Sequence, residues 1–429
     1  MQDKLNVSPG DYVEVKLIKK SYNGFFLESP ESDNGIILLK LDSGYNIGFN
    51  KKDVLSVKLI EKSSEKGESV EVKKDGKKPN LAMIITGGTI AAKLNPKKGG
   101  VDWLDTPESL FKYYPELFDK VNIVKVEVPF MKASEDMDFK DWQKIARSTE
   151  KLLNDSNIKG VIITHGTDFL HYTAAALSFF LKNLNKPVVL TYSQRSIDRA
   201  SSDANLNLQC SALAAISDIA EVMLVGHGSI NDDFCYAIPG TKARKMHSSK
   251  RDAFKSINHK PFAKIFQDRI EIISDYNQRM DKRKVKVDGK FEEKVVLLKV
   301  YPGQDPDILN YYLKKKYRGI VLEMSGLGHV PTSRARKGKS WIKKLKEVQK
   351  KGIIVCATSQ TIYGRVDPFV YSNGREILGT GVIYLEDMLP ETALVKLGHV
   401  LSKTSKKEEV KNLMLKNIAK EINYCLEKN

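Results

Sequence analysis

Long apolar runs, cysteine pairs and metal-binding spacings are all missing from this chain of 429 residues. The lack of an apolar run of about 18 residues argues against a membrane span, and the start lacks the apolar core of a secretory signal. The seven histidines show no H-E-x-x-H or similar spacing, so we expect no metal site. The cysteines form no C-x-x-C pair, which favours inert thiols and the reducing cytoplasm; they are Cys210, Cys235, Cys356 and Cys425.

Acidic residues are too few to balance the basic ones. The chain has 70 Lys and Arg against 53 Asp and Glu, which gives a net charge of +17 at pH 7. Such a charge attracts polyanions, including nucleic acid. A Lys-rich solvated surface explains the same numbers. No RNP1 motif or zinc knuckle is present, so the charge alone leaves both interpretations open.

The first 60 residues alternate apolar and polar side chains, as short strands do. Four segments show this pattern, and the third is long enough for two strands around its "DSG" turn: "DYVEVKLI", "GFFLES", "GIILLKLDSGYNIGF" and "DVLSVKLI". Five short strands in so few residues predict a small all-β barrel over residues 1–60. Residues 61–79 are charged and lack aromatics, which predicts a flexible linker.

From residue 80 onward, buried strands alternate with helices. "LAMIITGGTIAA", "GVIITHGTD", "KPVVLTYSQ" and "AEVMLVGHGS" are apolar runs, with helix-like stretches after them. This pattern predicts doubly wound parallel α/β sheets, in a larger domain over residues 80–285. After a charged stretch near Lys284 the alternation resumes in a smaller α/β domain, residues 295–402. Residues 403–429 should form a helical tail, with "KKEEVKNLMLKNIAKEINYCL" as one amphipathic helix.

Two of the predicted strands end in unusually polar tips, Thr86 to Thr89 and Thr164 to Asp168. Ligands of doubly wound sheets bind beyond the carboxyl ends of the strands. Glycines there let a ligand approach the backbone, and the next helix N-terminus offers N–H groups to an oxyanion. A strand-to-helix turn with a Thr cap explains one such tip but less readily two. Neither tip matches the P-loop, G-x-G-x-x-G or G-x-S-x-G motifs.

A Thr hydroxyl attacks a carbonyl only when a base takes its proton. A desolvated Lys can be that base. The stretch "PGTKARKMHSSKRDAFKS" offers Lys242, Lys245, Lys250 and Lys255, and any one of them can equally be a solvated charge. The residues alone therefore indicate hydrolysis or acyl transfer by a Thr, with the base unassigned.

"TGGTIAA", "THGTD" and "KMHSSKRDAF", in this order, resemble the asparaginase/glutaminase family over about residues 80–402. The resemblance implies a two-domain asparaginase-like fold and four catalytic residues, Thr89, Thr167, Asp168 and Lys245. It also implies substrate contacts by Gly88, Ser134, Glu135 and Gly166. Most free-standing asparaginases carry Gln where this chain has Glu135.

The loop after the first motif departs from the family. Family members often carry a Tyr there that assists the nucleophile, but this chain has Pro96 near that place, and Tyr113 and Tyr114 come too late. Either Thr89 or Thr167 can therefore be the attacking group. We expect the loop "AKLNPKKGGVDWLDTPESL" to be mobile and to close over the site.

The N-terminal segment extends the likeness to nearly the whole chain. "GDYVEV", "LKLDSGYNIGF", "KVYPGQDPDILNYYLKKKYRGIVLEMSGLGHVP" and "LEDMLPETALVKLGHVL" resemble the family of D-type subunits of archaeal glutamyl-tRNA(Gln) amidotransferases. This implies a glutaminase, without a cofactor of its own, that supplies ammonia to a tRNA-binding partner of the E type. That partner uses ATP and Mg²⁺ to amidate Glu-tRNA(Gln). The resemblance further implies a homodimer within a heterotetramer.

Two other functions compete with this one. A free-standing L-asparaginase with an added barrel would use the same chemistry, but it needs neither barrel nor linker. A non-catalytic RNA-binding scaffold would use the basic surface, but it would not need the Thr, Asp and Lys residues at the strand tips. The glutaminase subunit is therefore the prediction.

Overall fold

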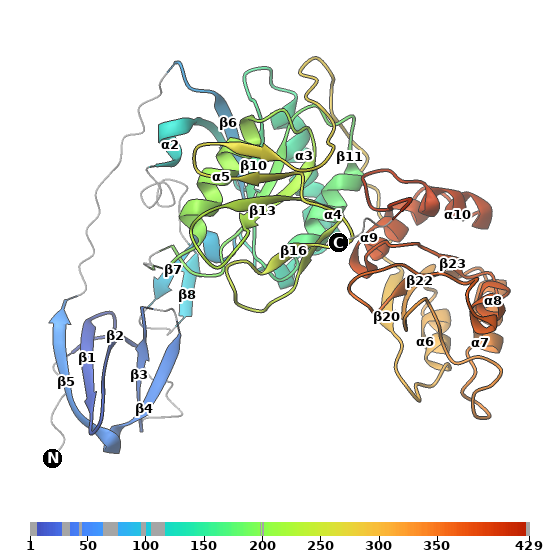
Figure 1. Ribbon diagram of the computed structural model, residues 1–429, viewed down its shortest axis with the longest axis horizontal. Coiled ribbons are helices and arrows are strands. Elements are labelled where there is room, and N and C mark those ends of the chain that lie inside the picture. The colour runs from blue at the N-terminus through green and yellow to red at the C-terminus, as the bar shows by residue number, and fades with distance from the viewer. Residues whose placement is uncertain are drawn as a thin grey trace.

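The computed structural model describes residues 7–27, 35–42, 45–62, 76–95, 100–103, 116–197, 199 and 201–425. Figure 1 shows a small β-sheet, a central α/β layer and a second α/β domain, arranged in chain order from blue to red. Within the described residues, no helix has the length and apolar character needed to cross a membrane.

The N-terminal segment forms a five-stranded antiparallel sheet in the order β4-β3-β2-β1-β5. Its elements are β1 (Tyr12–Leu17), β2 (Ser21–Leu27), β3 (Ile36–Lys40), β4 (Asn46–Asn50), the 3₁₀ turn η1 (Lys51–Asp53) and β5 (Val54–Glu61). Alternate residues such as Val13, Val15 and Leu39 are buried between flanking half-exposed ones. The prediction of five strands in a small all-β domain is confirmed, but among the described residues no pairing of the edge strands β4 and β5 closes the sheet into the predicted barrel. Most of the predicted linker lies outside the described residues.

The large domain contains an eight-stranded sheet in the order β18-β17-β14-β13-β12-β10-β6-β9. Five neighbouring strands run parallel: β9 (Asn122–Glu127), β6 (Asn80–Ile85), β10 (Val161–Thr164), β12 (Val188–Thr191) and β13 (Val222–His227). The predicted parallel sheet is thus confirmed. An antiparallel edge that the apolar pattern does not predict completes the sheet: β14 (Cys235–Pro239), β17 (Ala263–Ile265) and β18 (Ile270–Ile272).

Helices cover both faces of this sheet. Helices α3 (Phe139–Leu153) and α4 (Leu170–Phe180) pack with Ala82 and Ile84 on one face. Helices α2 (Leu117–Lys120) and α5 (Ala204–Ile216) pack with Met83 on the other. Successive residues of one strand therefore enter two separate cores, which explains why the strands read as continuous apolar runs.

The helix-like stretch expected after Gly87-Gly88 is wrong. A short 3₁₀ turn, η2 (Thr89–Ala91), leads directly into β7 (Ala92–Asn95), which pairs with β8 (Gly100–Trp103). Gly87 and Gly88 have φ angles of 114° and 82°, which turn the chain out of the strand. Ala92 then continues in an extended conformation (φ −135°), so helix growth stops after one turn.

Three short ladders and one more turn complete the large domain. β7 pairs with β8, β11 (Leu181–Lys182) with β19 (Lys286–Val287), and β15 (Ala243–Lys245) with β16 (Phe254–Ser256). The 3₁₀ turn η3 (Ser134–Asp136) follows β9.

The small domain has a parallel sheet in the order β20-β21-β22-β23. Its elements are β20 (Val295–Lys299), α6 (Ile308–Lys314), β21 (Gly319–Met324), α7 (Ile342–Lys350), β22 (Ile354–Ser359), α8 (Ser372–Leu378), β23 (Ile383–Tyr384) and α9 (Pro390–Leu401). The Lys-rich stretch of residues 334–351 contains α7, which buries Leu345 and Val348. Helix α9 packs against β20 and β21 and also against α4 of the large domain.

The tail helix is shorter than predicted. Helix α10 (Lys407–Leu415) packs Val410 and Met414 into the small domain and then ends. The ammonium group of buried Lys396 donates to the carbonyls of Met414 (2.8 Å) and Lys416 (2.6 Å) and contacts Glu421 Oε1 at 2.5 Å. Because Lys396 donates hydrogen bonds to carbonyls at the end of α10, the helix can end there without leaving those carbonyls unsatisfied.

Candidate active site

The two polar strand tips lie side by side. Strands β6 and β10 are parallel neighbours, with Ile85 opposite Thr164, so their carboxyl ends meet at one edge of the sheet. The Thr86 hydroxyl and backbone N–H both donate to the Thr164 carbonyl, at 2.8 and 3.2 Å. The predicted meeting of the two motifs is therefore seen in the backbone itself.

Glycines allow the two tips to touch. A Cβ on Gly88 would lie 2.4 Å from the backbone nitrogen of Gly166, and one on Gly87 would lie 2.4 Å from the Lys132 carbonyl oxygen. No real Cβ tolerates such distances, so a side chain at either position would force the loops apart. The packing of Gly88 on Gly166 brings Thr89, the next residue, to the edge of the second loop.

A third strand end adds Ser134 and Glu135. Strand β9 pairs with β6 on the side away from β10, and η3 follows it. The buried Ser134 hydroxyl accepts from the Phe169 N–H at 3.3 Å and donates to Glu135 Oε2 at 3.3 Å. A Cβ on Gly166 would lie 3.1 Å from Ser134 Oγ. The four predicted substrate contacts thus belong to one cluster of loops.

Lys245 reaches this cluster from the separate β15–β16 hairpin. Its ammonium nitrogen lies 2.8 Å from Thr167 Oγ1 and 2.8 Å from Asp168 Oδ1. The Lys245 side chain is only 10% exposed, whereas that of Asp168 is 62% exposed. A nearly buried amine therefore contacts a hydroxyl and a carboxylate that opens to solvent, which is an arrangement suited to proton transfer.

The other three lysines of this stretch lie elsewhere. Lys242 is fully buried against Asp387, Lys250 is exposed, and Lys255 pairs with Asp252 at 2.7 Å. Of the four lysines that periodicity left open, Lys245 contacts the polar strand tips.

Thr89 is held differently from Thr167. Its side chain is half-buried, and its hydroxyl makes no hydrogen bond within the part of the chain that the structure describes. Pro96, Tyr113 and Tyr114 lie outside the described residues. The choice of attacking hydroxyl between Thr89 and Thr167 therefore stays a prediction.

His165 is a part of the site that sequence reasoning missed. Burial lowers the pKa of its imidazole to about 4, so the ring is neutral at pH 7. Nδ1 lies 2.7 Å from the Gly166 carbonyl oxygen and Nε2 lies 2.9 Å from Thr173 Oγ1. Since a carbonyl only accepts, Nδ1 carries the proton and Nε2 accepts from the hydroxyl of Thr173. His165 thereby ties the glycine of the second tip to α4; its place inside the T-H-G-T-D motif was the available signal.

The described residues offer little support for a metal site or a reactive cysteine. Among the described residues, no group of three or more His, Cys, Asp or Glu side chains could hold a metal ion. Cys210, Cys235 and Cys356 are buried, and burial raises the pKa of Cys356 to about 12. Cys425 is exposed. The buried thiols match the expectation of inert cysteines.

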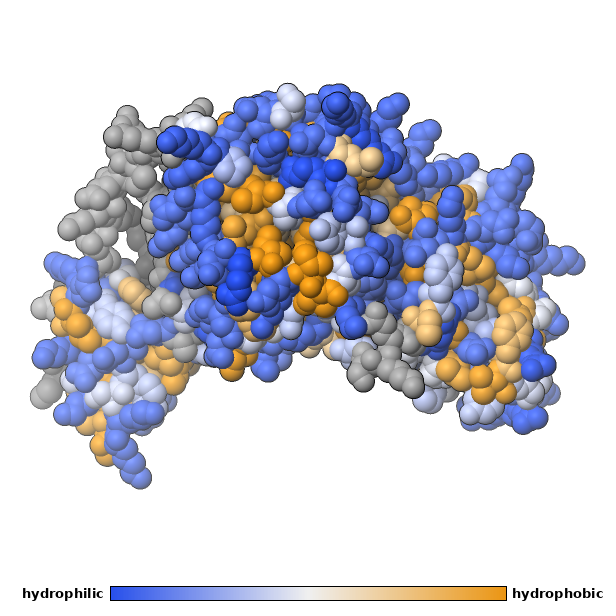
Figure 2. Space-filling model, turned by 45° about the horizontal axis from the view of Figure 1, so that its top comes forward, coloured by the Kyte–Doolittle hydropathy of each residue, from blue (hydrophilic) through white to orange (hydrophobic). Residues whose placement is uncertain are grey.

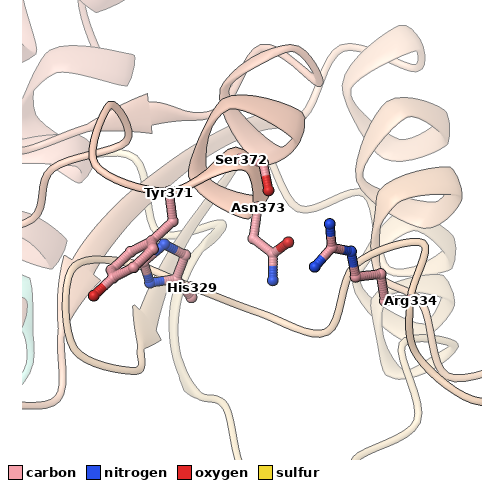
Figure 3. Close-up of a pocket in the computed structure, with 5 residues that line it drawn as sticks. All are labelled: His329, Arg334, Tyr371, Ser372 and Asn373. Carbon is pink, nitrogen blue, oxygen red and sulfur yellow. The ribbon is translucent and has the colours of Figure 1, made fainter.

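A separate cavity of about 220 Å³ lies in the small domain and is lined by His329, Arg334, Tyr371, Ser372 and Asn373 (Figure 3). The rings of His329 and Tyr371 meet edge to face, with centroids 5.6 Å apart, and Asn373 lies between them and Arg334. None of the predicted site residues lines it.

The face drawn in Figure 2 is largely hydrophilic, with apolar patches over both α/β domains.

Three family models together cover most of the chain. Residues 80–278 match "Asparaginase, N-terminal", and residues 294–414 match "Glutaminase/Asparaginase C-terminal domain". Residues 7–60 match "GatD N-terminal domain". The small β-sheet thus has a family of its own, in addition to the two α/β domains.

Curated relatives align with almost the full length. The D subunit of glutamyl-tRNA(Gln) amidotransferase from Pyrococcus furiosus is 46% identical over 425 residues, which cover 97% of this chain and 95% of that protein. The protein of the same name from Thermococcus kodakarensis is 47% identical over 420 residues, covering 95% and 93%. Among solved structures, the thermostable L-asparaginase of T. kodakarensis superposes with a TM-score of 0.70 at 30% identity and covers 81% of this chain and 100% of that one. L-asparaginase I of Vibrio cholerae gives a TM-score of 0.68 at 29% identity, covering 81% and 99%.

Proposed function

This chain belongs to the D-subunit family of glutamyl-tRNA(Gln) amidotransferases, and from that premise we propose that it is the glutaminase subunit of such an enzyme. It hydrolyses the side-chain amide of glutamine, and the released ammonia converts Glu-tRNA(Gln) to Gln-tRNA(Gln) on a partner subunit. The observation that carries the proposal is the bridge of Lys245 between Thr167 Oγ1 and Asp168 Oδ1, each at 2.8 Å, at the edge where the Gly88 loop packs.

The chemistry follows from this bridge. For this chemistry Lys245 first has to lose a proton; its free amine then accepts the proton of the Thr167 hydroxyl, and Asp168 stabilises the ammonium that forms. The oxygen of Thr167, or that of Thr89 once its own proton has passed to the deprotonated Thr167, forms a bond to the amide carbon of glutamine. The carbonyl π electrons move to oxygen. When the tetrahedral intermediate collapses, the C–N bond breaks, the nitrogen takes a proton from the site, and ammonia leaves. Water then cleaves the resulting ester and frees glutamate and the Thr hydroxyl.

The loops around the bridge have the chemistry to hold the substrate. Backbone N–H groups near Gly88 and Gly166 can donate to the developing oxyanion. Ser134 and Glu135 can bind the α-amino and α-carboxylate end of glutamine by hydrogen bonds and, for the amino group, by charge. Glu135 is exposed, so its carboxylate is open to an incoming substrate.

The acceptor half of the reaction belongs to the partner. We assign ATP and Mg²⁺, and the main tRNA contacts, to an E-type partner, and no cofactor to this chain. We place this chain as a homodimer within a heterotetramer in the cytoplasm. Its charge of +17 supplies diffuse Lys contacts to the tRNA phosphates rather than sequence recognition.

The free-standing L-asparaginase is the second candidate. The fold and strand tips serve asparagine as well as glutamine, and solved asparaginases cover 81% of this chain. The D-type relatives cover 97% of it, and residues 7–60 match the GatD N-terminal domain rather than an asparaginase model. This difference in coverage favours the amidotransferase component. The strand tips also argue against a scaffold that only binds RNA.

The dependence of glutamine hydrolysis on a partner and an acceptor tRNA distinguishes the amidotransferase subunit from a free-standing asparaginase. Ammonia released freely is lost to solvent and protonated, so a synthetic enzyme must hydrolyse glutamine only when an acceptor is ready. We expect low glutamine turnover by the chain alone and a strong rise with the partner and Glu-tRNA(Gln). The proposed gate is the loop of residues 92–110, of which 92–95 and 100–103 pair as β7 and β8 and the rest lies outside the described residues. Full turnover by the chain alone, unchanged on adding both, would favour the asparaginase.

A further inference from the structure

The hairpin that carries Lys245 is held at its base by the small domain and the C-terminal tail. The Thr241 hydroxyl donates to the Ala419 carbonyl of the tail at 2.8 Å. The Thr392 hydroxyl of α9 donates to the Thr241 carbonyl at 2.8 Å. Thr241 and Thr392 are buried, so water does not compete for these bonds.

A buried ion pair adjoins this base. Lys242 Nζ lies 2.6 Å from Asp387 Oδ2, and both side chains are fully buried. Asn423 of the tail donates its backbone N–H to Asp387 Oδ1 and its side-chain amide to Asp387 Oδ2, both at 2.8 Å. Asp387 thus binds a residue three positions before Lys245 and a residue of the tail.

The same tail residue reaches the far end of the hairpin. The Asn423 side-chain amide also donates to the carbonyl of Asn258, which follows β16. The Asn258 side chain exchanges two hydrogen bonds with the backbone of Gly364 in the small domain, at 2.9 and 3.0 Å. Both ends of the hairpin therefore converge on Asn423 and Asp387. Beside Lys245, Arg244 pairs with Glu391 of α9 at 3.1 Å.

We infer that Asn423, together with the buried Lys242–Asp387 pair, positions Lys245 for catalysis. The inference rests on the proposed function and adds residues that lie outside the substrate loops. Each strand of the hairpin has three residues, and its cross-strand register joins Lys245 to Phe254. So short a ladder relies on its anchors. Misplacement of a catalytic group by 1 Å can cost about 10²-fold in rate.

The first test is Asn423→Ala in the full-length chain, assayed alone and with its partner and Glu-tRNA(Gln). We expect kcat for glutamine hydrolysis to fall about 10-fold or more, with KM within about twofold. The KM expectation follows because Ser134 and Gly88 are carried by other elements. Tyr424→Ala is the matched control, because that neighbouring side chain is 90% exposed. The control should behave as wild type.

A double-mutant cycle separates positioning from a merely structural role. If Asn423 acts through Lys245, then Asn423→Ala should have little further effect on the residual rate of Lys245→Ala. Thr392→Val, which keeps the size but removes the hydroxyl from the same anchor, should lower kcat in the same way.

The outcomes are distinct. Unchanged kcat in Asn423→Ala, or equal losses in the wild-type and Lys245→Ala backgrounds, would overturn the inference while wild-type hydrolysis persists. A wild-type complex that hydrolyses neither glutamine nor asparagine would instead overturn the proposed function.

Discussion

The two strand tips of the candidate site are built in opposite ways. At the end of β10, Thr167 and Asp168 are held by a side chain, because Lys245 donates to both. At the end of β6, Thr89 is held by its backbone, because Gly88 packs on Gly166 while the Thr89 hydroxyl makes no hydrogen bond among the described residues.

This difference assigns two kinds of work. At the β10 tip, Lys245 already contacts both the Thr167 hydroxyl and the Asp168 carboxylate, as a proton transfer between them would require. The β6 tip contains a hydroxyl whose place is set but whose activation still needs a substrate or a closing loop. Which Thr attacks therefore depends on whether the contact of Lys245 with Thr167 or the binding of substrate near Thr89 activates the hydroxyl.

Removing the side chains of either tip should have the largest effect. Thr89→Ala, Thr167→Ala, Asp168→Ala and Lys245→Met should each lower glutamine hydrolysis by roughly 10³-fold or more, because groups acting as one unit lose most of the rate singly. Ammonia release by the assembled enzyme measures this. Lys250→Met, an exposed lysine of the same stretch, is the control. If any two of the four site variants keep near-normal turnover, the assignment is wrong.

A covalent label can distinguish the two hydroxyls, Thr89 and Thr167. A diazoketone analogue of glutamine should label the attacking Thr covalently, and mass spectrometry of the labelled peptide identifies it. Labelling of Thr89 would mean that the β6 hydroxyl is activated only on substrate binding. Labelling of Thr167 would make the β10 tip sufficient for attack.

Gly88→Ala tests whether backbone packing alone places Thr89. Gly88 has φ 82°, and its added Cβ would strike Gly166; Gly338 has φ 81°, and an added Cβ there meets nothing within 4 Å. Both variants should lose roughly 1–3 kcal/mol of stability because Ala rarely adopts a positive φ angle, and Gly88→Ala should lose more because of its clash with Gly166. Only Gly88→Ala should also lower turnover, by about 10²-fold. Equal turnover in both would show that the glycine contact does not set the site.

His165 should make the β10 tip sensitive to acid. Its pKa is about 4 in the folded chain, against an ordinary 6.5, because burial disfavours the imidazolium. Below pH 6.5 the unfolded chain binds a proton that the folded chain refuses until about pH 4, so stability falls as pH falls through that window. From pH 7 to 5 this group should remove about 2 kcal/mol from the free energy of unfolding.

Urea titrations at pH 7 and 5 measure that loss. His171 and His399, whose pKa values burial lowers to about 3 and about 4, add their own losses. The quantity to compare is therefore the difference between wild type and His165→Gln, in which the acid loss should shrink. An identical loss in both would show that His165 does not stay neutral at the tip.

Deleting residues 1–78 should leave both tips unchanged. We expect the shortened chain to stay soluble and keep its basal turnover within about twofold, because domains of this kind fold as units. Coupling to tRNA amidation should weaken severalfold. A shortened chain that amidates Glu-tRNA(Gln) normally with its partner would show that the N-terminal sheet does not dock the complex.

Sequence patterns predicted the parts of the fold that local physics determines. Apolar runs predicted the parallel strands, and the helix-like stretches between them predicted helices such as α3 and α5. The helix expected after Gly88 failed because positive φ angles and pairing with β8 override a local apolar pattern. The tail helix ends early because Lys396, distant in sequence, takes its last carbonyls.

The candidate site was also predictable only in part. The sequence placed the two polar strand tips in one sheet, but the choice of Lys245 needed either the family resemblance or the fold. Lys242 lies three positions away and is fully buried against Asp387, yet the sequence gives both lysines the same local appearance. The role of His165 also depends on the α4 hydroxyl of Thr173, which only the packing of the helix against the strand brings near.

The buried pairs Lys242–Asp387 and Lys396–Glu421 make the junction of the large domain, small domain and tail respond to heat differently from an apolar core. The hydration of charged groups becomes less favourable as temperature rises, so the cost of burying these ions falls. Apolar stabilisation gains little more over the same range. The anchors of the Lys245 hairpin should therefore contribute a growing share of the total stability on warming, and the hairpin should be held least firmly in the cold.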